Sequence, residues 1–193
     1  MTRLTHTDLM TLETYSKQRE SFRAKVMAHK KNRRVALGDN ATLYFEDRLT
    51  IQYQIQEMLR IEKIFEEAAI EEELTAYNPL VPDGNNLKAT FMIEYADIAE
   101  RRIALGKLIG IEDSIWVNID GFDKVFAIAD EDMERDNAEK TSAVHFMRFE
   151  FSDEMTNAAK NGADIIIGSD HQNLKVSNTI TPEIRQSLVS DFG

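Results

Sequence analysis

The chain lacks cysteine altogether, and among its 193 residues it has three prolines, one tryptophan and four histidines. The absence of cysteine excludes disulfides, thiolate zinc sites, cysteine-ligated iron–sulfur clusters and thiol nucleophiles. No apolar run approaches the roughly 20 residues of a membrane span, and the first residues do not resemble a signal peptide. We therefore expect a protein outside the membrane, in the cytoplasm.

Basic residues are outnumbered and unevenly placed. The 23 lysines and arginines face 34 acidic residues, which gives a formal charge of −11. Residues 1–48 carry ten basic and six acidic side chains, a net +4, whereas residues 49–193 carry thirteen and 28, a net −15. Because most of this surface would repel phosphate groups, the balance argues against binding of nucleic acid.

The local excess of cations lies around residues 29–34 and allows two interpretations. It could form an exposed patch that binds an anionic ligand or an acidic partner. It could equally be a set of cations that complements the negative end of a helix. The residues of this basic segment are His29, Lys30, Lys31, Arg33 and Arg34.

Helical periodicity dominates the first 80 residues. Residues 6–33 predict one kinked helix or two short ones, and the turn at 38–40 predicts a hairpin between two short strands. Residues 47–77 predict one long helix that ends before Pro79. On its helical wheel the apolar side chains form one arc, while Gln52 and Gln56 fall opposite and are expected to face water.

Strands and helices alternate after the loop at 80–86. Four predicted strands and two predicted helices follow in the order β-α-β-β-α-β, with the second helix over the acidic residues 130–139. This order is typical of a ferredoxin-like split unit, in which all four strands share one sheet. The predicted strands of this unit, within residues 87–151, are 87–95, 115–119, 124–128 and 143–151.

The pattern as a whole predicts an α+β fold with a mostly antiparallel sheet. A helix at 153–161, a buried strand at 163–168 and a tail helix begun by Pro182 complete the chain. We expect residues 1–193 to form a single α+β domain. Its helical N-terminal part, residues 1–80, would pack as a layer on the sheet-rich part, residues 87–193.

The motifs of the common enzyme classes are missing. There is no glycine-rich dinucleotide loop, no phosphate-binding loop with its lysine, and no nucleophile elbow. None of the four histidines has a second histidine or a glutamate at the spacing of a metal-binding helix. The residues therefore do not identify a cofactor, which stays unknown. Whether the chain is an enzyme also stays open.

A few polar residues at apolar positions remain as candidate ligands. Glu62 falls inside the apolar arc of the predicted helix, with Glu57 nearer its edge, and His145 shares the apolar face of strand 143–151, which also carries Arg148. Packing of these faces would bury Glu62 beside His145. The result would be a structural ion pair, a ligand pocket or a metal site. A metal site would require a bent helix, because five residues separate the two glutamates by about 140°.

A second candidate follows the apolar strand that ends near Gly168. Asp170 and His171 could bind a metal or transfer protons, since ligands often collect at strand ends. Neighbours on a strand point to opposite faces, however, so an ordinary loop explains the pair equally well.

Four stretches together resemble an uncharacterised bacterial domain-of-unknown-function family. They are His29–Gly38, Phe45–Arg60, Tyr77–Gly84 and Thr141–Phe146, and the similarity extends over about residues 9–168. Members of that family are often encoded near rubrerythrin-like proteins and iron–sulfur oxidoreductases. The resemblance implies an accessory role, with a protein partner, in an iron-dependent or peroxide-related redox system. It implies no activity, cofactor or catalytic residue.

Two hypotheses of function follow. The chain is a non-enzymatic accessory protein that binds a redox partner, or it is an enzyme that binds a small ligand or metal in a pocket of Glu57, Glu62 and His145, with Arg148 or His29 as cationic support.

Overall fold

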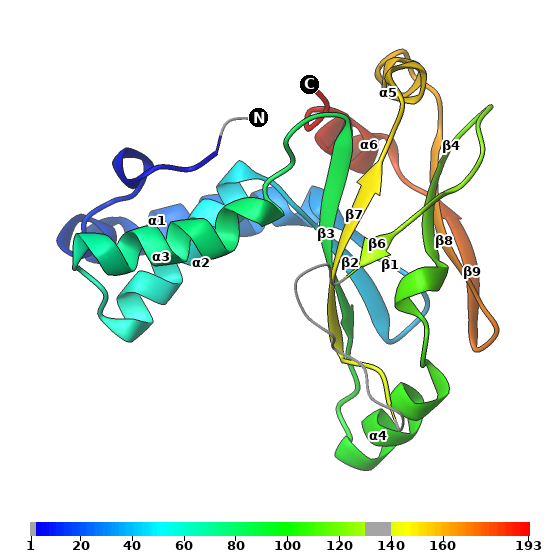
Figure 1. The fold of residues 1–193 in the computed structure, drawn as a ribbon, viewed down its shortest axis with the longest axis horizontal. Coiled ribbons are helices and arrows are strands. Elements are labelled where there is room, and N and C mark those ends of the chain that lie inside the picture. The colour runs from blue at the N-terminus through cyan, green and yellow to red at the C-terminus, as the bar shows by residue number, and fades with distance from the viewer. Residues whose placement is uncertain (1–2, 130–139) are drawn as a thin grey trace.

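The computed structural model describes residues 3–129 and 140–193 and has an α+β fold with two antiparallel sheets (Figure 1). The predicted fold class is therefore confirmed, while the helix predicted over residues 130–139 lies outside the described residues. The first sheet has the strand order β1 (Arg34–Ala36), β2 (Ala41–Glu46), β3 (Asn86–Ile93), β7 (Val144–Glu150) and β6 (Ile128–Ala129). The second has the order β5 (Val125–Phe126), β4 (Ile115–Ile119), β8 (Ile165–His171) and β9 (Leu174–Thr179).

The prediction of a ferredoxin-like split unit is wrong. The strands predicted at 87–95 and 143–151 do pair with each other, as β3 and β7 of the first sheet. The predicted hairpin of 115–128 also forms, but β4 then pairs with β8 in the second sheet. The four strands are thus divided between two sheets, because β8 and not β3 or β7 supplies the neighbour of β4.

One close contact shows why β4 and β8 fit each other. Trp116 of β4 stands opposite Gly168 of β8 in the register of the pair. A Cβ atom at position 168 would lie 2.5 Å from the Trp116 ring, so the indole occupies space that any other residue would fill. The glycine therefore makes room for the large side chain at the centre of the second sheet.

The two sheets share one hydrophobic core and are joined at both sides. Core residues come from both sheets, among them Phe45 and Phe91 of the first and Val117 and Ile167 of the second. On one side the chain passes from β5 to β6 and so changes sheets, as strands do at the corners of such sandwiches. On the other side Asn178 Nδ2 of β9 donates a 2.9 Å hydrogen bond to the carbonyl of Ala36 in β1.

Three helices cover the ends of this sandwich. Figure 1 shows α4 (Ile98–Lys107) at one end and both α5 (Asp153–Lys160) and α6 (Pro182–Val189) at the other. Each begins with a side-chain cap, from Asp97, Ser152 and Thr181 respectively. No helix in the described part of the chain is both long and apolar enough to cross a bilayer.

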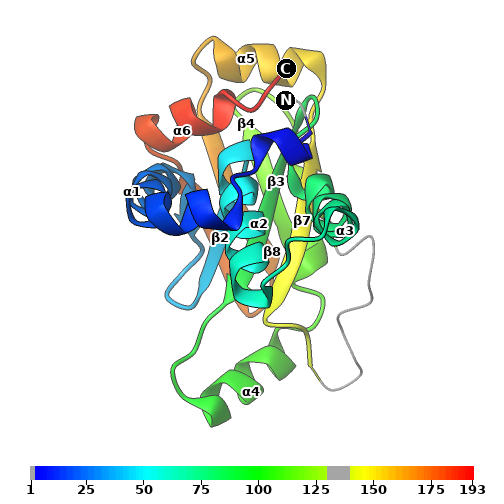
Figure 2. The same ribbon diagram turned by 90° about the vertical axis from the view of Figure 1, so that its left-hand side faces the viewer.

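The N-terminal helices project from the first sheet as an arm. They are α1 (Leu12–Lys30), α2 (Arg48–Glu62) and α3 (Glu67–Tyr77), and Figure 2 shows the arm pointing toward the viewer. The expected helical layer is thus attached near the sheet and extends away from it. The arm has its own hydrophobic cluster, in which Ile51, Ile55 and Leu59 of α2 pack with Ile70 and Leu74 of α3. That both clusters belong to one domain stays a prediction.

The single long helix predicted over 47–77 is two helices. Helix α2 ends at Lys63, which adopts the left-handed conformation with φ of 55°. Glycine or asparagine usually occupies such a position, so the lysine in the sequence does not indicate that the helix ends here. The apolar spacing continues through this turn, although Ile61 and Phe65 are 57% and 71% exposed.

Two glutamines of α2 bind the N-terminal segment instead of facing water. The Gln56 side chain is fully buried, accepts from the Met10 N–H at 2.5 Å and donates to the Met10 carbonyl at 3.2 Å. Gln52 Nε2 donates to the carbonyl of Asp8 at 2.6 Å. The prediction that this side of the helix faces water is wrong, because the N-terminal segment around Asp8 and Met10 packs along it.

Glu57 links α1 to α2 within the arm. Arg19 donates to both Glu57 carboxylate oxygens at 2.8 and 2.9 Å, and the buried Tyr15 hydroxyl donates to Oε1 at 2.5 Å. These bonds, led by the Arg19 pair and extended by Tyr15 and Arg60, outweigh burial and lower the pKa of Glu57 from 4.5 to about 2. Burial and the Glu57 carboxylate raise the pKa of Tyr15.

We expect Glu57→Gln to destabilise the protein at pH 7 by about 1 to 2 kcal/mol. Each pKa unit corresponds to about 1.4 kcal/mol, reduced here because the Arg19 side chain is partly screened by solvent. Because folding lowers the pKa of Glu57, its stabilisation is complete above the unfolded value of 4.5 and is lost as the pH falls toward 2. The difference from wild type in urea unfolding should therefore shrink over this interval. The exposed Glu62 provides a control, and equal behaviour of Glu57→Gln and Glu62→Gln would contradict the prediction.

Candidate functional site

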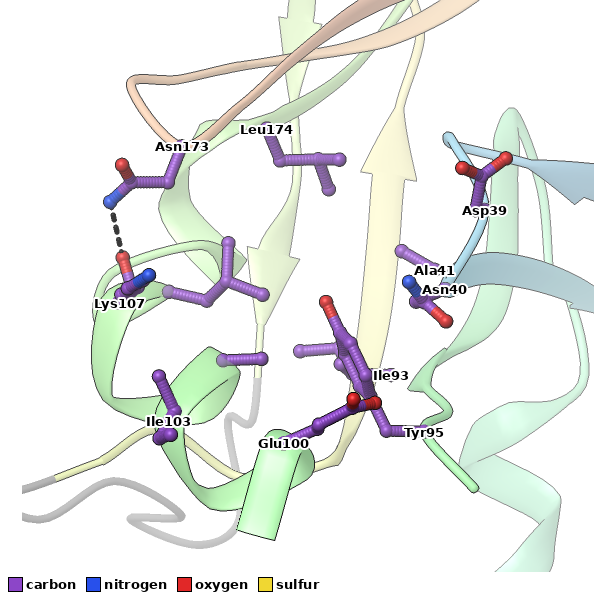
Figure 3. Close-up of a pocket in the computed structure, with 12 residues that line it drawn as sticks. Asp39, Asn40, Ala41, Ile93, Tyr95, Glu100, Ile103, Lys107, Asn173 and Leu174 are labelled. Atoms are coloured by element: carbon purple, nitrogen blue, oxygen red, sulfur yellow. Dashed lines mark hydrogen bonds between the residues drawn. The ribbon is translucent and has the colours of Figure 1, made fainter. Parts of the chain in front are cut away.

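A cavity of about 390 Å³, here called the α4 pocket, lies between α4 and the ends of the two sheets. Its walls come from the β1–β2 turn, the end of β3, α4 and the β8–β9 turn (Figure 3). The apolar part of the lining consists of Ala41, Ile93, Ile103, Ala104, Leu108 and Leu174. The polar part consists of Asp39, Asn40, Tyr95, Glu100, Lys107 and Asn173.

Helix α4 supplies one wall of the pocket through a single face. Positions 100, 103, 104, 107 and 108 follow the spacing that places side chains on one side of a helix. The Asp97 cap fixes the start of this helix, since its carboxylate accepts from the Glu100 N–H at 2.8 Å. At the other end Asn173 Nδ2 donates to the Lys107 carbonyl at 2.6 Å, which joins the β8–β9 turn to α4.

The chemistry of the lining suits binding of an apolar group. Figure 3 shows Asp39 and Asn40 on one side of the pocket and Lys107 and Asn173 on the other. Aliphatic and polar residues contribute equally to the lining, and none of them is a histidine. In ligand pockets the apolar contacts usually supply the binding and the polar groups fix the orientation of what is bound. Within residues 3–129 and 140–193, no three His, Asp or Glu side chains are placed to hold a metal.

The predicted ligand set of Glu57, Glu62 and His145 is not brought together. Both glutamates belong to the arm, whereas His145 lies in β7 of the first sheet. The prediction that Glu62 is buried is wrong, since it is exposed at the last residue of α2. The helical wheel placed it among apolar residues whose helix in fact ends there. Glu57 lies within the network with Arg19 and Tyr15.

His145 is fully buried on the apolar face of β7, as its alternation with apolar residues predicts. Its Nε2 lies 2.9 Å from Thr141 Oγ1 and 3.1 Å from the Ser142 carbonyl, and the Glu112 carboxylate is 4.0 Å away. The ring stacks obliquely on Phe91 of the neighbouring strand. These contacts account for a hydrogen-bonded core histidine, and a ligand role for it stays a prediction.

Arg148 lies on the other face of β7 from His145, because side chains alternate along a strand. Its Nη1 is 2.5 Å from a carboxylate oxygen of Glu150. It lines a second cavity of about 360 Å³ together with Arg3, Asp83 and Lys88, among others. Arg148 therefore cannot support His145 in one pocket, and its role as a ligand residue also stays a prediction.

The basic segment is divided between the surface and the interior. Lys31 and Arg34 are exposed, and Lys30 is half-buried. Arg33 is buried, so the expected exposed patch is wrong for this residue. His29 is half-buried, and its Nε2 lies 2.5 Å from a carboxylate oxygen of Asp47. Binding of an anion or an acidic partner by the remaining exposed cations stays a prediction.

Arg33 uses its whole guanidinium group inside the protein. It donates to the carbonyls of Phe45, Glu46 and Ser187 at 3.0 to 3.1 Å and forms an ion pair with Asp191. Its Nε also lies 3.5 Å from the Asp47 carboxylate. One buried cation therefore connects the end of α1 with β2, the start of α2 and the C-terminal residues.

The two carboxylates beside Arg33 have opposite pKa shifts. Burial alone would raise the pKa of Asp47, but the charge of Arg33, the Thr50 N–H and His29 hold it below its usual value. Burial raises the pKa of Asp191 to about 6, although Arg33 acts to lower it. One Asp191 oxygen is buried without a hydrogen-bond partner, which agrees with this direction.

His171 is a structural residue of the β8–β9 turn. Its Nε2 donates to the Ile109 carbonyl at 3.1 Å, and its Nδ1 accepts from the Asn173 N–H at 3.2 Å. Both ring nitrogens are therefore engaged, while Asp170 forms an exposed ion pair with Lys124 at 2.8 Å. Asp170 and His171 are the last two residues of β8, so the loop expected there is wrong, but these contacts give both residues structural roles.

The α4 pocket was not predicted from the sequence. Its polar residues come from segments far apart in the chain, for example Asp39, Tyr95, Lys107 and Asn173. The spacing along α4 identifies a helix face, but which segments would meet that face depends on how the two sheets pack.

We expect Arg33→Gln to destabilise the protein by about 3 to 5 kcal/mol, because removal of the cation leaves the buried Asp191 carboxylate unpaired. Lys31→Gln, in the same segment but exposed, should change stability by less than about 0.5 kcal/mol. Denaturant unfolding of both variants measures the difference. Similar midpoints for the two variants would show that the buried network contributes little.

Comparisons with known proteins agree with the predicted kind of family. The chain is similar to a "novel protein of unknown function" from Burkholderia pseudomallei K96243, whose crystal structure was determined at 1.90 Å resolution. The two sequences are 52% identical, the alignment covers 100% of each chain, and the TM-score is 0.94. No curated protein matches the chain. A family model described as "Protein of unknown function (DUF3501)" matches residues 3–192. The chain therefore belongs to this family of proteins of unknown function, DUF3501.

Proposed function

We propose that the chain is a partner-binding accessory protein and that its α4 pocket receives an apolar side chain of a protein partner. The observation that carries this proposal is that Ile103 lines the pocket and is nevertheless 60% exposed. Ala104, Leu108 and Leu174 also line the pocket, so an exposed aliphatic side chain is joined to an apolar part of the lining. Exposed apolar surface of this kind is typical of interaction sites.

The polar rim supports a protein occupant with an apolar anchor. Asp39 and Glu100 provide carboxylates, Lys107 provides an ammonium group, and Asn173 provides an amide. Polar groups next to aliphatic ones are typical of a protein interface, where an apolar anchor is buried and polar groups surround it. Burial of one aliphatic side chain contributes about 1.5 to 3 kcal/mol, enough to determine which peptides bind.

The redox setting rests on the family resemblance alone. That resemblance suggests a rubrerythrin-like protein and an iron–sulfur oxidoreductase as the first partners to test. Binding of each purified protein can be measured directly by calorimetry. If neither protein binds, the proposed role in a redox system is contradicted. The proposal that the pocket binds an apolar side chain is tested separately.

Peptides selected from a displayed random library against the wild-type protein test the pocket. We expect the enriched peptides to share an apolar residue and to bind Ile103→Ser about tenfold more weakly, which corresponds to about 1.4 kcal/mol. Phe126→Ser is the control, because Phe126 is 45% exposed but lies on β5, outside the pocket. Absence of enrichment, or equal binding to Ile103→Ser and wild type, would refute the proposal.

A further inference from the structure

The far end of the arm carries an apolar cleft that is independent of the α4 pocket. The cleft has a volume of about 200 Å³ and lies between the N-terminal segment, the end of α2 and the start of α3. Figure 1 shows these segments at the tip of the arm, away from both sheets. Its apolar walls include Leu9, Leu12, Leu59, Ile64 and Ile70. We call this surface, with Ile61 and Phe65, the arm tip.

Large apolar side chains at the arm tip are exposed to water. Phe65 lines the cleft and is 71% exposed, and Ile61 in the last turn of α2 is 57% exposed. Both flank Lys63, whose left-handed conformation ends α2 and leaves residues 64–66 in the turn. An exposed aromatic residue beside an apolar cleft provides an anchor for association, since burial of Phe contributes about 1.5 to 3 kcal/mol.

The charge around the cleft is strongly negative. Residues 60–73 contain six glutamates against Arg60 and Lys63, a net −4. Arg60 is already paired with Glu57 at 3.3 Å. None of the six forms an ion pair with another residue of the described ranges. They are Glu62, Glu66, Glu67, Glu71, Glu72 and Glu73.

Three of these glutamates are neighbours of residues that line the cleft. At 100° per residue, positions 67 and 73 of α3 fall about 60° to either side of Ile70. Glu66 precedes the helix and directly follows Phe65. Ile70 lines the cleft, so the apolar surface is bordered by carboxylates. Unpaired carboxylates beside an apolar cleft complement a segment that presents apolar side chains flanked by cations.

We propose that the arm tip binds an amphipathic helical segment of a protein partner, with apolar side chains in the cleft and lysine or arginine residues beside the glutamates. A helix seated in an apolar groove is a common mode of peptide recognition. An anionic membrane surface fits less well, because the net −4 charge of the tip would be repelled by it. A second copy of this chain is the remaining occupant that the experiment must distinguish.

The probe is a synthetic amphipathic helix of leucine and lysine, whose binding is measured by fluorescence anisotropy. We expect Phe65→Ser to weaken binding about tenfold. Neutralising Glu66 and Glu67 to glutamine should also weaken binding and reduce its dependence on salt, because exposed charges are screened by ions. Phe126→Ser, at the 45% exposed Phe126 of β5, and Glu154→Gln with Glu183→Gln are matched controls for apolar and acidic groups elsewhere, and they should bind as wild type does. The same peptide with glutamate in place of lysine should not bind.

Several results would overturn this assignment. They include no binding of the lysine peptide, equal binding by Phe65→Ser and wild type, and equal loss of binding in the control variants. Binding to phosphatidylserine vesicles that Phe65→Ser abolishes would assign the tip to a lipid surface. Sedimentation that shows a dimer in wild type and a monomer in Phe65→Ser would assign it to self-association. Because the arm-tip proposal depends on Phe65 and the pocket proposal on Ile103, failure at the arm tip leaves the α4 pocket unaffected.

Discussion

Arg33 and its buried partners hold together parts of the chain that are far apart in sequence. A guanidinium group inside a protein requires nearly all of its donors to be used, and here three backbone carbonyls and two carboxylates surround it. The contacts fix the start of α2 through Asp47, which also caps that helix, and they fix the C-terminal residues through Asp191. The root of the arm and the end of the chain are therefore positioned by one side chain.

The sandwich that supports this network depends on which strands become neighbours. β4 pairs with β8 rather than with β3 or β7, and the small Gly168 opposite Trp116 shows how closely the two strands fit. The second sheet thus forms from β4 and β5, which precede β7 in the chain, and from β8 and β9, which follow it. Its packing against the first sheet creates the shared core and the space that α4 covers.

The two apolar surfaces proposed as binding sites lie at or beside helices. One is on α4 at an end of the sandwich, and the other is at the tip of the arm (Figure 1). Their charges differ, since the α4 pocket has groups of both signs and the arm tip is acidic. The two surfaces therefore differ in the chemistry of what each could bind.

The sequence by itself determined the fold class and most of the elements. Local spacing identified α1, the β1–β2 and β4–β5 hairpins and the capped helices α4 to α6, but it missed β9 and so the β8–β9 hairpin. The buried position of His145 followed from strand alternation. The tertiary structure decided how these elements combine. Periodicity could not reveal the end of α2 at Lys63, because apolar spacing continues through the turn, and so Glu62 was misplaced. Charge alone could not separate Arg33 from Lys31, because burial of a cation depends on carboxylates and carbonyls that only folding brings near. The α4 pocket was likewise invisible, since its walls meet only when two sheets with non-local pairing pack together.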